Sequence, residues 1–175
     1  MPRVILRAPS LRDESAFLAA ARRGRRLHHP FAHPPLTSDA FRRYVRRARG
    51  PDHAGHFVID PHTGALAAVV NLNEIVRGQL QSAYLGYYAF AGYAGRGFVR
   101  AGVARVLDVA FGSLGLHRVE ANIQPENRRS VALVKRLGFR REGYSPRYLQ
   151  IAGVWRDHER WALLCDEWRP GRTHG

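Results

Sequence analysis

Apolar positions recur every three to four residues in four parts of the chain, which predicts four amphipathic helices. Ser10 is a suitable N-cap for a helix that runs to about Arg26, and Thr37 or Ser38 for a second helix that runs to Arg49. The other two helices are expected over 98–114 and 126–136. Gly138 follows the last of them, where a left-handed residue commonly ends a helix.

Between these segments the apolar positions alternate or form short continuous runs, which predicts β-strands. The expected order is strand, two helices, three strands, helix, strand, helix and two strands. Turn residues separate the strands, and Ala152-Gly153 joins the last two as a hairpin. The expected strands cover 3–7, 56–60, 65–73, 81–90, 117–123, 139–150 and 154–165.

Length and composition favour one globular domain over residues 1–175, with the last six or so residues as a disordered tail. The chain has 175 residues, 45% of them hydrophobic, which is sufficient for one core. No apolar run is long enough for a membrane span, and the first residues do not resemble a signal peptide. With Cys165 as the one cysteine, we expect a cytoplasmic protein without disulfides, either a monomer or a homodimer.

Positive charge is concentrated near the N-terminus. The net charge is +14, and the first 50 residues hold twelve Arg against Asp13, Glu14 and Asp39. Arginines gather at 22–26 and at 42–49, and two interpretations stay open: a solvated helical face, or a surface that attracts RNA or other polyanions. No nucleic-acid-binding motif is visible, so we expect no sequence-specific recognition of nucleic acid.

A glycine-rich segment, Gly92-Tyr93-Ala94-Gly95-Arg96-Gly97-Phe98-Val99-Arg100, lies between a predicted strand and a predicted helix. Glycines allow the backbone to approach a ligand, and the first amides of the helix then point at it, which is an arrangement that binds phosphate. Arg96 and Arg100 add positive charge. The segment lacks the Gly-Lys-Ser/Thr of a P-loop and the third glycine of a dinucleotide-binding fingerprint. We therefore predict a pyrophosphate site of another kind at Gly95–Arg100.

This loop and the segment Pro125–Arg141 resemble the GCN5-related N-acetyltransferases, the GNAT superfamily. The family loop reads Gln/Arg-x-x-Gly-x-Gly/Ala, from which Ala94 and Val99 depart here. The resemblance implies an α+β fold: a mixed, mostly antiparallel sheet of about seven strands, helices on both faces, and a V-shaped splay at the strand before the loop. It also implies acetyl-CoA as co-substrate, with the pyrophosphate on the loop.

The same resemblance assigns further contacts to acetyl-CoA. The amides of the strand end, Tyr88, Ala89 and Phe90, would hold the pantetheine arm and the thioester oxygen, and Asn127 would meet the pantetheine. Metal is not expected in this chemistry. His28, His29 and His33 lie in a proline-rich loop without an acidic partner, which does not favour a metal site.

A narrower resemblance is to ribosomal-protein-alanine N-acetyltransferases of the RimJ type. It is carried by four motifs in register: Asn71-Leu72-Asn73, Val76-Arg77-Gly78, Tyr84-Leu85-Gly86-Tyr87 and Gly153-Val154-Trp155-Arg156-Asp157-His158. It implies a protein or peptide N-terminus as acceptor, in possible association with the ribosome. Two alternatives stay open: a small-molecule amine as acceptor, and a non-catalytic ribosome-associated factor.

Candidate catalytic residues follow from what acetyl transfer requires. Many relatives place a tyrosine seven residues after the asparagine as general acid, but Val134 stands there in this chain. Ser130 is the alternative donor to the departing thiolate, although a serine in a first helical turn often only bonds the backbone. Glu74 is a candidate base, and Arg77 and Tyr148 are candidate contacts to the acceptor.

Overall fold

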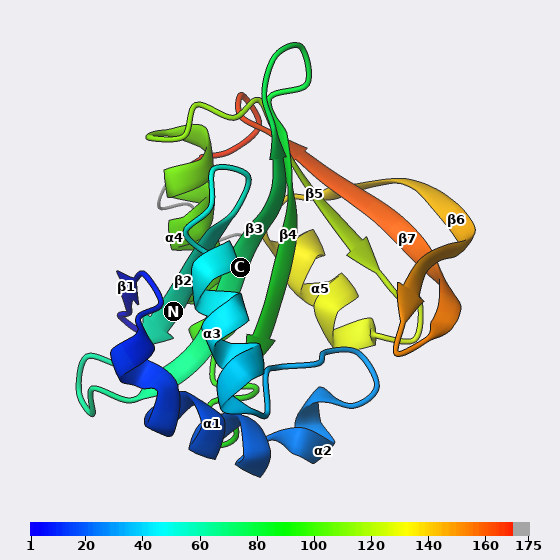
Figure 1. Ribbon diagram of the computed structural model, residues 1–175. Coiled ribbons are helices and arrows are strands. Elements are labelled where there is room, and N and C mark those ends of the chain that lie inside the picture. The colour runs from blue at the N-terminus through cyan, green and yellow to red at the C-terminus, as the bar shows by residue number, and fades with distance from the viewer. Residues whose placement is uncertain (170–175) are drawn as a thin grey trace.

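The computed structural model describes residues 1–169; the tail expected at the C-terminus lies outside them. Seven strands form one sheet in the order β1-β2-β3-β4-β5-β7-β6 (Figure 1). Only β4 and β5 are parallel neighbours, and every other pair is antiparallel. The strands are β1 (Ile5–Arg7), β2 (Ala54–Ile59), β3 (Leu66–Val76), β4 (Ser82–Ala89), β5 (Arg118–Ile123), β6 (Arg140–Ile151) and β7 (Val154–Leu164).

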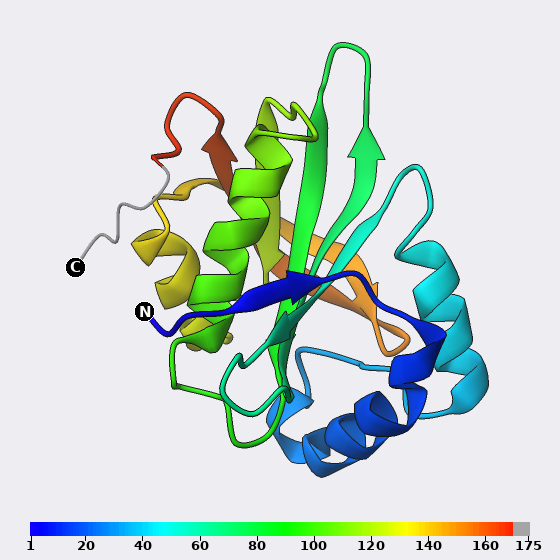
Figure 2. The same cartoon turned by 90° about the vertical axis from the view of Figure 1, so that its left-hand side faces the viewer.

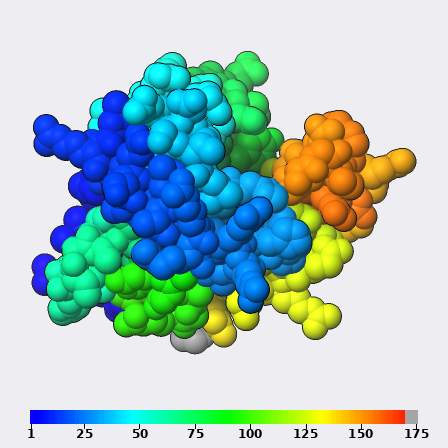
Figure 3. Space-filling view, turned by 60° about the horizontal axis from the view of Figure 1, so that its bottom comes forward, coloured from blue at the N-terminus to red at the C-terminus, as the bar shows by residue number. Residues whose placement is uncertain are grey.

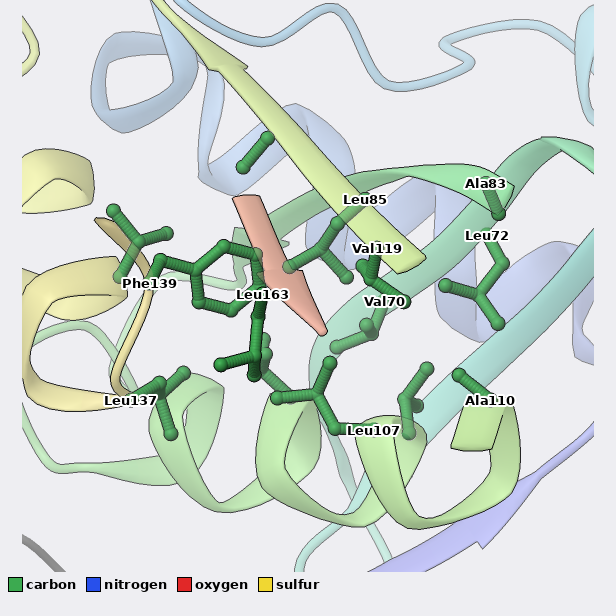
Figure 4. Close-up of a cluster of buried hydrophobic side chains, with 14 of the residues drawn as sticks. Val70, Leu72, Ala83, Leu85, Leu107, Ala110, Val119, Leu137, Phe139 and Leu163 are labelled. Carbon is green, nitrogen blue, oxygen red and sulfur yellow. The ribbon is translucent and has the colours of Figure 1, made fainter. Parts of the chain in front are cut away.

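Helices cover both faces of this sheet (Figures 1 and 2). On one face, α4 (Phe98–Phe111) and α5 (Arg128–Arg136) pack against the alternating apolar residues of β3, β4 and β5. Figure 4 shows Leu107 and Ala110 on the side of α4 that faces Val70, Leu72 and Leu85 of the sheet. On the other face, α1 (Glu14–Arg23) and α3 (Ser38–Arg47) enclose an aromatic core. The mixed sheet with helices on both faces confirms the expected fold class.

The first predicted helix is interrupted, which corrects the expectation of one helix over 10–26. Ser10 forms a capping box with Asp13, but it caps a short 3-10 helix (Leu11–Asp13) that leads into α1. The chain then breaks at Gly24 and continues as α2 (Arg25–His28). A Cβ on Gly24 would lie 2.7 Å from His28 Cε1, so glycine at this position leaves room for the His28 ring.

Other element boundaries also differ from the prediction, most of them by one to three residues. Strand β3 extends to Val76 through an irregularity at Glu74, which has a positive φ of 50°. Helix α5 begins at Arg128, because the Asn127 side chain accepts from Ser130 N and caps it there. Helix α3 ends at Arg47. Gly138 has a φ of 89° after α5, which confirms the predicted left-handed residue.

Strands β4 and β5 pair only at their beginnings, from Ser82↔Arg118 to Tyr84↔Glu120. Beyond Tyr84, β4 continues along β3, and beyond Glu120, β5 continues along β7. Figure 1 shows the two strands separating toward their C-terminal ends. This divergence is the V-shaped splay that the resemblance implies.

No helix within residues 1–169 is long and apolar enough to cross a bilayer. In the same range, no group of three or more His, Cys, Asp or Glu side chains is placed so that it could hold a metal ion.

Candidate active site

The edge of β4 that faces the splay carries main-chain groups without a strand partner. Phe90 N donates to Ala67 O at 2.9 Å, so its amide is turned toward β3. Adjacent residues of a strand direct their main-chain groups to opposite sides, so the amides of Tyr87 and Ala89, beyond the last pair with β5, face the splay. This corrects the expectation for Phe90, whose amide is not free to bind a ligand. The amide of Tyr88, which pairs with Val69, faces β3 for the same reason, so the expectation for Tyr88 is corrected as well.

The glycine-rich loop follows β4 and ends at the first turn of α4. Gly92, Gly95 and Gly97 have φ values of 88°, 76° and 82°, a region that L side chains rarely adopt. Gly97 is the N-cap of α4, which has 14 residues. The first amides of such a helix have no intrahelical acceptor and carry the positive end of its dipole. A Cβ on Gly92 or Gly95 would meet nothing within 4 Å, so this backbone is open to a ligand.

Tyr93 and Arg96 fix the shape of the loop. The Tyr93 ring packs edge-to-face on Phe98 at 5.0 Å, and its hydroxyl lies 3.1 Å from Thr63 Oγ1 in the β2–β3 turn. Arg96 donates to Gly92 O at 3.0 Å, and its guanidinium lies over the rings of Tyr93 and Phe98. Arg96 thus stabilises the conformation of the loop, and its positive charge stays next to the loop backbone.

The residues of the loop fit a diphosphate. Neither Arg96 nor Arg100 pairs with a carboxylate among residues 1–169, so both charges remain available to an anion. Val99 is half-buried against the core and places its amide in the first helical turn. Open glycines, first-turn amides and uncompensated arginines together form a site that favours phosphate oxygens.

The start of α5 faces the splay from the side of α4. Asn127 Oδ1 accepts from Ser130 N at 3.2 Å, so the amide of Ser130, rather than its hydroxyl, meets the helix cap. Tyr87 on β4 reaches the same turn and donates from its hydroxyl to Ser130 O at 3.3 Å. Burial raises the pKa of Tyr87 to about 12, with the Ser130 side chain acting in the opposite direction. Val134, one turn further on, is completely buried and has no proton to donate.

A row of polar side chains crosses the opposite face of the sheet at the point where the strands separate. Asn73, Tyr84 and Glu120 are register partners on β3, β4 and β5. The pKa of Tyr84 is raised to about 12, first by burial, then by a hydrogen bond to Tyr148, and then by the negative charges of Glu120 and Glu74. Tyr148 and Glu74 therefore both lie close enough to Tyr84 to raise its pKa.

Arg77 lies away from this row. Its guanidinium donates to Leu114 O at 2.6 Å and to Gln81 Oε1 at 3.3 Å, beyond the C-terminal end of α4. Asp157 accepts from Tyr144 Oη and from Arg147 N, where it supports the bulge in β6. Tyr84 and Tyr87 lie in one of the motifs that carry the narrower resemblance, but no role could be assigned to them from the sequence, because an alternating strand does not reveal which face carries chemistry.

His28 joins the N-terminal helices to the end of β4. The side chain is 4% exposed, and Nε2 lies 2.7 Å from Ala89 O. Its ring packs edge-to-face on Tyr88 at 5.2 Å. Burial lowers the pKa of His28, opposed by the bond to Ala89, and burial also lowers the pKa of His56.

We expect the free energy of unfolding to fall as the pH decreases from 7.5 to 5.5. The unfolded chain takes up protons on its histidines near pH 6.5, whereas folded His28 and His56 resist protonation, so acid favours the unfolded state. Urea denaturation at the two pH values measures this difference. The His28→Gln variant keeps a donor for Ala89 O and should lose less free energy of unfolding between pH 7.5 and pH 5.5. An equal loss in the variant and the unmodified protein would contradict the assignment to His28.

Comparison with known proteins places this geometry in a family. Residues 3–140 match the model of the acetyltransferase (GNAT) domain. The chain is 37% identical over 115 residues to the [ribosomal protein uS5]-alanine N-acetyltransferase of Escherichia coli, a match that covers 66% of this chain and 59% of that protein. The aligned region thus spans less than two thirds of that curated relative.

Two solved structures share the whole fold. Mycobacterium smegmatis RimJ in complex with CoA-disulfide superposes with a TM-score of 0.87 and 26% identity, covering 99% of this chain and 86% of that one. Spermidine N-acetyltransferase from Vibrio cholerae, in complex with CoA and spermine, gives a TM-score of 0.79 and 25% identity, covering 94% and 96%. The chain belongs to the GNAT family of acetyltransferases, whose members depend on acetyl-CoA.

Proposed function

We propose that this protein transfers the acetyl group of acetyl-CoA to the N-terminal α-amine of a protein, of the ribosomal-protein-alanine type. The observation that carries the proposal is the splay itself: free β4 amides, the diphosphate loop at one end, and the polar row of Tyr84 on the other face. The name of the Escherichia coli relative and that of the Mycobacterium smegmatis structure support this class of acceptor. A ribosomal acceptor would place the reaction in the cytoplasm.

In the proposed reaction, the neutral amine attacks the thioester carbonyl carbon directly. A C–N bond forms, the C–S bond breaks, and the thiolate of coenzyme A leaves. The β4 amides of Tyr87 and Ala89 stabilise the negative charge on the thioester oxygen, as an oxyanion hole does. Ser130 donates its proton to the thiolate, and Glu74, or water beside it, accepts the proton of the amine.

The loop and the start of α5 hold the donor. Gly95, Arg96, Gly97 and the amides of Val99 and Arg100 bind the diphosphate, and Asn127 contacts the pantetheine arm. Main-chain groups at Ala89 line the path between them. Tyr148 contacts the acceptor on the opposite face; Arg77, bonded to Leu114 O, would contact only a part of the acceptor remote from the reacting amine.

An α-amine suits this site because it is easier to deprotonate than lysine. Its pKa is about 8, against roughly 10.4 for a lysine side chain. Near neutral pH a much larger fraction of the α-amine is therefore neutral and nucleophilic, and a weak base such as the exposed carboxylate of Glu74 is sufficient.

A small-molecule amine is the second candidate, and the similarity to a spermidine acetyltransferase favours it. The charge of this chain opposes it, since a net charge of +14 repels a polycation.

Thiol release from acetyl-CoA should therefore be faster with an Ala-starting peptide than with spermidine at equal concentration. Faster release with spermidine would favour the second candidate, and release with neither would favour a non-catalytic factor.

A further inference from the structure

The three N-terminal helices form one continuous surface rich in arginine. Figure 3 shows α1, α2 and α3, coloured dark blue to cyan, side by side on the face turned to the viewer. We call this surface the arginine face. Its arginines, all exposed, are Arg22, Arg23, Arg25, Arg26, Arg42, Arg43, Arg46, Arg47 and Arg49.

Packing fixes the direction of these side chains. Helix α1 buries Phe17 and Ala21, and α3 buries Phe41, Tyr44 and Val45, in the aromatic core against the sheet. The arginines of both helices occupy the remaining positions and project to solvent. In α3 they fall at 42, 43, 46 and 47, which is one side of a helix.

Little negative charge compensates this surface. Within residues 1–169, Arg42 is the one member of the arginine face that pairs with a carboxylate, at 3.3 Å from Glu14. Arg22 donates to Leu36 O and Arg49 to Pro9 O, contacts that leave the charge in place. By contrast, arginines in the C-terminal half, such as Arg118 and Arg140, pair with Glu142. With twelve Arg against three acidic residues, the first 50 residues carry +9 of the net charge of +14.

The arginine face also borders the proposed acceptor side. Tyr44 of α3 donates to Asn71 on β3 at 3.0 Å, two residues before Asn73, which is the register partner of Tyr84. The helices therefore cover the same face of the sheet that carries the polar row. A large acceptor that presents an N-terminus to this row would lie against the arginines.

We propose that the arginine face binds the phosphate backbone of RNA, so that the enzyme acetylates N-termini presented on ribonucleoprotein particles. This inference rests on the proposed function. Arginine forks match phosphate geometry, and so many uncompensated charges bind it without reading sequence. A membrane surface is a poorer match, because α1 and α3 bury their apolar sides in the core and have none to insert.

The test compares two variants of equal net charge. Arg43→Gln/Arg47→Gln removes two charges from the arginine face. Arg105→Gln/Arg136→Gln removes two exposed charges from α4 and α5, on the other side of the sheet. Binding to a short RNA hairpin is measured by fluorescence anisotropy at several salt concentrations, with polyglutamate as a competing acidic polymer. Acetylation is followed with a short Ala-starting peptide and with purified ribosomal subunits.

We expect the arginine-face variant to lower the slope of log K against log[salt] by about 2, roughly 1 for each lost phosphate contact. The control variant should keep the slope of the unmodified protein. Acetylation of ribosomal subunits should slow only in the arginine-face variant, and peptide acetylation should be unchanged in both.

Equal slopes in the two variants would overturn the inference, because the attraction would then depend on total charge. Displacement of RNA by polyglutamate at lower concentration would also overturn it, in favour of an acidic protein as partner. If the unmodified protein acetylates the peptide but does not bind RNA, the arginine-face inference fails and the proposed function stands. If no peptide is acetylated, the proposed function fails whatever the RNA result.

Discussion

Replacing Gly97 with glutamate should abolish the rise in melting temperature that acetyl-CoA produces. A ligand that binds only the folded state stabilises it by about 2.7 kcal/mol at 100 times its Kd, roughly 5–10 °C for a chain of this size. Gly97 has a φ of 82° and caps α4, so a carboxylate there would block the first-turn amides and repel the diphosphate. Differential scanning fluorimetry with and without acetyl-CoA measures the shift.

Strain alone must be separated from this effect, because a Cβ at position 97 would also lie 3.1 Å from Pro2. Gly115→Glu is the matched control: Gly115 has a φ of 59° and open space around its Cβ, and it lies beyond the opposite end of α4. It should lower the melting temperature but keep the acetyl-CoA shift. A normal shift in Gly97→Glu would place the diphosphate elsewhere on the molecule.

Ser130→Ala should lower kcat by at least about 30-fold while leaving the KM for acetyl-CoA nearly unchanged. Positioned proton transfer typically contributes 10²–10⁴-fold to a rate, and the buried Val134 cannot supply the proton. The amide of Ser130, which meets the Asn127 cap, is retained in the variant. Steady-state kinetics with an Ala-starting peptide give both constants.

Ser113→Ala provides the control for loss of a hydroxyl near a helix end. Ser113 Oγ donates to Val109 O beyond the C-terminal end of α4, so neither constant should change. A threefold loss in Ser130→Ala would show that Ser130 is not the acid and that water protonates the thiolate. A rise in KM with constant kcat would make Ser130 a contact to the donor.

The order of helices and strands could be read from the sequence because most elements carry a clear period. The break at Gly24 could not, since it depends on the contact of that residue with the His28 ring, four positions later. The loop around Gly97 was predictable because left-handed glycines before a helix are a local signal. The splay between β4 and β5 was expected from the family resemblance and could not be predicted from the periodicity.

The acceptor side was the least predictable part of the site. The row of Asn73, Tyr84 and Glu120 exists only because three strands align in register, one of them parallel to its neighbour. Likewise, the amide direction of Phe90 depends on its pairing with Ala67. The alignment of side chains across strands and the direction of an amide depend on how the strands pair, which the hydrophobic pattern of one strand does not reveal.

The position of the transferred acetyl group tests the central proposal most directly. A peptide that begins with alanine and contains one internal lysine is incubated with the protein and acetyl-CoA, and the product is fragmented in a mass spectrometer. The proposal predicts the acetyl group on the α-amine and an unmodified lysine, as the difference in amine pKa favours. An acetyl group on the lysine side chain would contradict N-terminal acetylation.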